Sequence, residues 1–195
     1  INNEPKCVEL FQREAQVLSY LNHPSIPKME LDAYFTFLPL NSKQPLHCLV
    51  MEKIEGLNLS EYLHKRRSPI EQKLAIQWLT HLVEILQAVH NQNFFHRDIK
   101  PTNIMLKTDG HLALIDFGTA RAVTHTYLAK QPLGNVTGVV SPGYTPIEQM
   151  NGQAVLQSDF FALGRTFVYL LTGKDPREFY HPHTQELCWR HAAPS

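Results

Sequence analysis

The 195-residue sequence predicts an α+β fold, with β-rich segments in its first third and at its centre and helical patterns elsewhere. Two observations carry this prediction. Runs of β-forming residues at 33–37 and 47–52 are separated by a polar loop that contains two prolines. Apolar residues recur at three- and four-residue steps over 5–21 and 68–90, the spacing of helices with one buried face.

Three helices are expected. The first begins at Pro5, since proline suits the first helical turn, and ends before Pro24. The second begins at 68–71, where Ser and Glu have the spacing of a capping box, and runs to about His90. The third covers 158–171, is apolar nearly all round and should therefore be buried, with Gly173 ending it.

Composition excludes some classes of function. The formal net charge is zero and 43% of residues are hydrophobic, so the chain is able to bury a core, and neither nucleic acid nor an anionic membrane is favoured as a partner. The apolar run 160–173 is shorter than the roughly 20 residues of a membrane span and contains Arg165. Three widely spaced cysteines without a CxxC pattern indicate a reduced, cytoplasmic protein.

A hairpin at 104–115 brings two oxygen ligands together. If Asp109-Gly110 is a two-residue turn, Asn103 lies directly opposite Asp116, with their side chains on one face of the hairpin. A wider turn would shift this pairing by one residue. One carboxylate and one amide oxygen suit Mg²⁺, which keeps several waters and takes other ligands from substrate phosphates.

The segment before this hairpin carries further groups for phosphoryl transfer. Asp98 is a carboxylate able to orient an attacking hydroxyl and accept its proton. Lys100, two residues later, is able to neutralise charge on the phosphoryl group. Positioning and electrostatics would therefore supply most of the catalysis.

The stretches His96-Arg97-Asp98-Ile99-Lys100-Pro101-Thr102-Asn103 and Asp116-Phe117-Gly118 resemble the signature motifs of eukaryotic-type protein kinases, in their bacterial-like serine/threonine form. The resemblance implies a two-lobed fold, with a partial β-rich small lobe at 1–54 and a partial, mostly helical large lobe at 55–195. It implies that Asp98 is the catalytic base, that Lys100 contacts phosphate, and that Asn103 and Asp116 hold Mg²⁺ beside ATP. Lys100 is typical of serine/threonine kinases, so the expected substrate is a protein Ser or Thr hydroxyl.

The resemblance also implies a nucleotide site. Glu14 takes the place of the glutamate that pairs with the nucleotide-binding lysine, with a solvated helix glutamate as the alternative. Met51 would guard the adenine pocket, although a methionine at a strand end is more often a core residue. Backbone groups of Glu52 and Ile54 would bind adenine, and Asn58 falls near the ribose.

The segment 119–147 contains no acidic residue and resembles an activation segment. A phosphate on one of its threonines would pair with Arg97. The candidates are Thr124, Thr126 and Thr137. Val140 replaces a usual glycine, and Pro146-Ile147-Glu148 replaces Ala-Pro-Glu. Ser141 is expected to touch the loop 96–103 that contains Asp98, called the catalytic loop below. Asp159 is expected to accept backbone hydrogen bonds from that loop.

Three functions are compatible with these observations: a protein serine/threonine kinase, which is favoured, a noncatalytic kinase-like interaction module, and a small-molecule kinase. The sequence contains no Gly-x-Gly-x-x-Gly, and Lys6 is too close to Glu14 to be its partner. The chain therefore resembles a kinase domain truncated at both ends, and we expect it to be weakly active or inactive when isolated, because the clamp over the ATP phosphates is missing.

Overall fold

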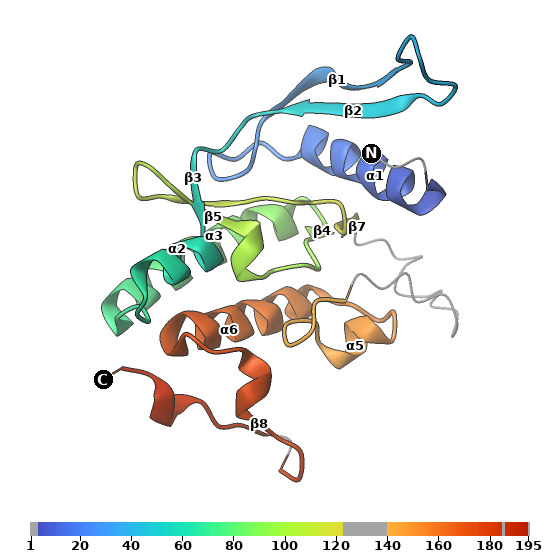
Figure 1. Ribbon diagram of the computed structural model, residues 1–195. Coiled ribbons are helices and arrows are strands. Elements are labelled where there is room, and N and C mark those ends of the chain that lie inside the picture. Colours follow the sequence, from blue (N-terminus) through green and yellow to red (C-terminus); the bar gives the residue numbers. More distant parts are fainter. Residues whose placement is uncertain (1–3, 123–139, 185, 195) are drawn as a thin grey trace.

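The structure is a computed structural model that describes residues 4–122, 140–184 and 186–194. Its elements form two parts, one above the other in Figure 1. The upper part packs helix α1 (Pro5–Tyr20) against the antiparallel strands β1 (Met29–Phe37) and β2 (Leu46–Met51). The lower part contains helices α2 (Leu59–Arg66), α3 (Gln72–Asn91) and α6 (Leu156–Thr172). This partial two-lobed α+β arrangement confirms the predicted fold class, whereas the boundary at residue 54 stays a prediction.

Short elements complete the described fold. A three-stranded antiparallel sheet has the order β3 (Gly56–Asn58), β5 (Ile104–Lys107) and β6 (Leu112–Leu114), and β4 (Phe94–Phe95) pairs with β7 (Arg121–Ala122). Helix α5 (Ile147–Met150) precedes α6, and β8 (Tyr180–His181) pairs with β9 (Glu186–Leu187). Single 3-10 turns lie at η1 (Pro101–Asn103), η2 (Pro176–Phe179) and η3 (Arg190–Ala192). No helix in the described ranges is long and apolar enough to cross a membrane.

Helix α1 and strands β1 and β2 confirm the sequence prediction. The helix begins at Pro5 and buries Ala15, Val17 and Leu18. Strand β1 begins at Met29, earlier than the predicted 33, with an irregularity in its pairing between Met29 and Tyr34. The upper part is attached to the lower part by the loop after α1, because the carbonyl of Ser25 accepts the Leu114 amide at 2.8 Å.

Helix α3 begins later than the capping-box spacing predicts. Its first residue is Gln72, with Glu71 as the N-cap, and Ser68 instead accepts a hydrogen bond from the Arg66 guanidinium at 3.2 Å. The reason is a tertiary contact. The buried Ile70 donates its amide to the carbonyl of Leu170 at 3.0 Å, so the segment before α3 bonds to the end of α6 instead of joining the helix. The predicted start at Ser68 is therefore wrong.

One hydrophobic core joins α3 and α6 with residues of α1, α2 and the central hairpin. Trp78, Leu82, Ile85 and Val89 of α3 are buried, as the helical spacing predicts. Helix α6 ends at Gly173, whose φ of 70° is the left-handed cap expected there. The prediction of a buried helix is confirmed for the face that carries Leu163, Phe167 and Leu170, but Phe160 and Phe161 are 41% and 42% exposed.

The central hairpin has a three-residue turn rather than the predicted two. Met105 pairs with Ala113, and the amide of Gly110, at φ 86°, donates to the carbonyl of Lys107 at 3.0 Å. A type I turn followed by a left-handed glycine has this form. The pairing shifts by one residue. The backbone carbonyl of Asn103 accepts the amide of Ile115 at 3.0 Å, so Asn103 does not lie directly opposite Asp116.

Candidate active site

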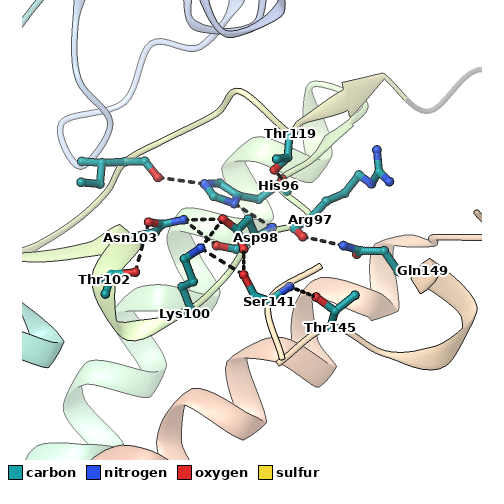
Figure 2. A network of polar contacts seen from close by, with 11 residues as sticks. His96, Arg97, Asp98, Lys100, Thr102, Asn103, Thr119, Ser141, Thr145 and Gln149 are labelled. Carbon is teal, nitrogen blue, oxygen red and sulfur yellow. Dashed lines mark hydrogen bonds and ion pairs between the residues drawn. The ribbon is translucent and has the colours of Figure 1, made fainter. Parts of the chain in front are cut away.

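Asp98 lies at the centre of a buried polar network, and Figure 2 shows three side chains directed at its carboxylate. Ser141 donates its hydroxyl to Oδ1 at 2.6 Å, and Lys100 Nζ donates to Oδ2 at 2.7 Å. Asn103 Nδ2 donates both to Oδ2 and to the Asp98 carbonyl, each at 2.9 Å. The carboxylate is 3% exposed, so these charge-assisted bonds hold it in one orientation.

A second buried carboxylate holds the loop that carries Asp98. Asp159 at the start of α6 accepts the amide of His96 at 2.9 Å and that of Arg97 at 2.8 Å. These bonds confirm the sequence prediction for Asp159. The prediction did not include His90, whose Nε2 lies 2.8 Å from Asp159 Oδ2. Its partner is 69 positions away, and no local pattern indicates a contact over that separation.

His96 is buried and connects the loop to the hairpin. Its Nε2 donates to the carbonyl of Ile115 at 3.1 Å, and its Nδ1 accepts the Asp98 amide at 3.3 Å. One neutral tautomer satisfies both bonds. Burial lowers the pKa of His96, against the smaller raising effects of Asp159, Asp98 and Asp116, which agrees with the neutral ring that the two bonds require.

Two loop residues have left-handed backbones. Arg97 has φ 70° and Asp116 has φ 65°, both uncommon for residues with a Cβ. Gln149, which the sequence analysis missed, donates its amide to the Arg97 carbonyl at 2.6 Å. Such strained residues cluster at functional sites, and here they directly precede Asp98 and Phe117.

Glu14 faces the start of the Asp-Phe-Gly segment. Its Oε1 accepts the amide of Phe117 at 3.3 Å, which places α1 close to the active site. A Cβ at Gly118 would lie 3.5 Å from Asp116 Oδ1 and 3.8 Å from Glu14 Oε2, so the two carboxylates flank one point. Burial, and then the charge of Asp116, raises the pKa of Glu14. The alternative of an ordinary solvated glutamate does not fit these contacts.

The remaining predicted nucleotide residues lie along the end of β2 and the start of α2. Met51 is half-buried and packs on the core. The amide of Glu52 donates to the Lys28 carbonyl at 2.8 Å. Asn58 is the N-cap of α2, where its side chain accepts the Glu61 amide at 2.9 Å. Roles of Glu52, Ile54 and Asn58 toward a nucleotide stay predictions.

Part of the predicted activation segment lies outside the described residues, including Thr124, Thr126 and Thr137. Its end is described. Lys100 Nζ donates to the hydroxyl of Ser141 at 3.0 Å, and the Ser141 amide donates to Thr145 at 2.8 Å, so Ser141 touches the catalytic loop as expected. Val140 is exposed, and Glu148 accepts the hydroxyl of Ser158 at 2.8 Å.

The two-part fold, and the loop that carries a buried aspartate, a lysine and an asparagine, agree with the kinase-type arrangement that the sequence motifs predict. The family model for the protein kinase domain matches residues 2–192. The chain belongs to the protein kinase family, whose members in general use ATP and a divalent metal.

Several bacterial serine/threonine kinases are similar to this chain. It is 38% identical to serine/threonine-protein kinase PknA of Nostoc sp. (strain PCC 7120) over 99% of this chain. It is 38% identical to serine/threonine-protein kinase F of Synechocystis sp. (strain PCC 6803) over 94%, and 32% identical to PrkC of Bacillus subtilis over 89%. The matches cover 34%, 38% and 25% of these relatives, so the chain spans between a quarter and about two fifths of their length.

Proposed function

We propose that the protein of which this chain forms the catalytic core transfers the γ-phosphoryl group of ATP to Ser or Thr hydroxyls of proteins. The network around Asp98 carries the proposal, because it presents a fixed, buried carboxylate flanked by Lys100. The names of the similar bacterial proteins support the serine/threonine class. Two outcomes of the experiment below would instead favour a noncatalytic interaction module or a small-molecule kinase.

In the proposed reaction, the substrate hydroxyl approaches Asp98, which orients it and accepts its proton. The hydroxyl oxygen forms a bond to the γ-phosphorus, and the bond between that phosphorus and the bridging oxygen breaks as ADP leaves. Lys100 Nζ lies 2.7 Å from Asp98 Oδ2, so it would face the phosphoryl group during transfer and stabilise its charge. Nearly all of this catalysis is orientation and electrostatics.

Asn103 and Asp116 are the residues that would hold Mg²⁺. Asn103 Nδ2 points to Asp98, so its Oδ1 is the atom for a cation. The carboxylates of Asp116 and Glu14 lie within 4 Å of one point beside Gly118, and carboxylate oxygens are among the ligands that Mg²⁺ takes in proteins. When bound, Mg²⁺ would neutralise charge on the ATP phosphates.

The test is transfer of labelled γ-phosphate from ATP with Mg²⁺ to a generic basic protein, using the full natural chain. Asp98→Asn should lower kcat about 100- to 10,000-fold, the typical contribution of a general base. Asp109→Asn is the matched control, since Asp109 is an exposed turn residue and the variant should keep full activity. Absence of transfer by folded wild-type protein would contradict the proposal and favour an interaction module, whereas transfer to metabolites alone would favour a small-molecule kinase.

A further inference from the structure

The backbone of Arg97 is held from two directions. Its φ of 70° lies in the left-handed region, where a residue with a Cβ stays only if its surroundings maintain it. Its amide donates to Asp159 Oδ1 at 2.8 Å, and its carbonyl accepts Nε2 of Gln149 at 2.6 Å. The amide and the carbonyl of Arg97, which lie in the peptide units on either side of its Cα, are therefore both bound by side chains that follow the predicted activation segment.

Gln149 is placed for this contact by α5. It is 4% exposed, and Figure 2 shows its amide directed at the Arg97 carbonyl from the side opposite the Asp98 network. The Arg97 carbonyl belongs to the peptide bond that joins Arg97 to Asp98. The orientation of that peptide plane sets the direction in which the Asp98 side chain leaves the backbone.

We propose that Gln149 is a positioning residue for catalysis, which fixes the Arg97–Asp98 peptide so that Asp98 faces the substrate hydroxyl. The inference rests on the proposed kinase function. It also assigns a coupling: Gln149 directly follows Pro146-Ile147-Glu148 at the end of the predicted activation segment, so the position of this end of the segment affects the orientation of the catalytic base. A misplacement of about 1 Å at a reacting group costs about 100-fold in rate.

The first test compares Gln149→Met with wild type in the full natural chain. Methionine keeps the length and volume of the side chain but removes the donor. We expect kcat to fall about 10- to 100-fold while KM for ATP and for the basic protein stays within about twofold. Thr172→Val is the matched control, because it removes another buried side-chain hydrogen bond, to the Val168 carbonyl at 2.6 Å, at the far end of α6. Equal kcat values for Gln149→Met and Thr172→Val would overturn the inference.

A second variant provides a pH signature. In Gln149→Glu the new carboxyl donates a hydrogen bond to the Arg97 carbonyl only when it is protonated. When ionised, its oxygens are acceptors only and repel the carbonyl oxygen of Arg97. Its kcat, divided by that of wild type at each pH, should therefore rise toward one as pH falls through the pKa of the new carboxyl. A merely structural role predicts a ratio without this pH dependence. A flat ratio would contradict the inference.

Hydrogen exchange separates this inference from the proposed function. Amides of residues 96–103 should exchange at least about tenfold faster in Gln149→Met than in wild type, with no such change in Thr172→Val. If wild type transfers no phosphate, the proposed function fails and the catalytic role of Gln149 fails with it. If wild type is active but neither kcat nor exchange changes in Gln149→Met, only the inference fails.

Discussion

Asp159 serves three donors with one carboxylate, the amides of His96 and Arg97 and the ring of His90. Asp159 and the His96 and Arg97 backbone are buried, so water does not replace the carboxylate as acceptor for these two amides. Asp159→Asn places an amide NH₂ where an acceptor is required, and should lower the free energy of unfolding by about 1–3 kcal/mol. Urea denaturation measures this change. Asp109→Asn, on the surface, should change it by less than about 0.5 kcal/mol, and a similar value for both variants would contradict the role of Asp159.

His96 predicts a pH dependence of stability. Its pKa in the folded protein is lowered by burial below the ordinary 6.5, so the unfolded chain binds the proton more readily. Stability from this group is therefore complete above about pH 6.5 and falls as pH decreases toward the folded pKa, by up to about 1.4 kcal/mol per pH unit.

Urea denaturation between pH 7.5 and 5 measures this slope. His96→Gln should reduce the slope, because it removes the titrating ring. His64→Gln, at an exposed position of α2, should leave the slope unchanged. A wild-type slope that His96→Gln does not reduce would show that other groups cause it.

The grouping of side chains around Asp98 could be predicted because their types and spacing are local, whereas their chemical roles stay proposals. Asp98, Lys100, Asn103 and Asp116 lie within two short motifs, and the structure brings three of them into one network. Gln149 could not be predicted in this way, because its contact spans 52 positions and a glutamine near a helix start has many ordinary uses. The large sequence separation between contacting residues, rather than the type of side chain, limited what could be predicted about the site.

At the scale of the element, two glycines provide a matched comparison. A Cβ would meet nothing within 4 Å at Gly110 or at Gly164. Gly110 has φ 86° in the hairpin turn, so Gly110→Ala should destabilise the protein by about 1–2 kcal/mol. Gly164 lies inside α6, and Gly164→Ala should stabilise by about 0.5–1 kcal/mol. Thermal unfolding measures both shifts, and shifts of the same sign would contradict this interpretation.

The boundaries of elements were predicted less well than their existence, because tertiary contacts override the local sequence preferences there. The apolar stripe of α3 was predicted because it follows helical spacing, but its first residue was not, because Ile70 bonds to α6 instead of starting the helix. The hairpin was predicted from Asp109-Gly110, but the turn is one residue longer and moves Asn103 out of direct opposition to Asp116. One residue of register changes which side chains face each other.

At the scale of the whole molecule, the two parts differ in how much core they bury. Strands β1 and β2 form a two-stranded sheet on which Phe35, Phe37 and Val50 are 46%, 54% and 58% exposed. Helices α3 and α6 share the main core. Amides of β1 and β2 should therefore exchange with solvent at least about tenfold faster than those in the middle of α3 and α6. Hydrogen exchange with mass spectrometry measures this, and equal protection of both parts would show a single cooperative unit.

The bonds from Asp159 to the catalytic loop also set an order of events during synthesis. His96 and Asp159 are 63 positions apart, so a ribosome adding about 5–20 residues per second takes about 3–13 s to pass from one to the other. During that interval the loop has left the site of synthesis without the carboxylate that fixes its backbone. The catalytic geometry is therefore assembled only after α6 has emerged, and a nascent chain halted between these positions is expected to lack it.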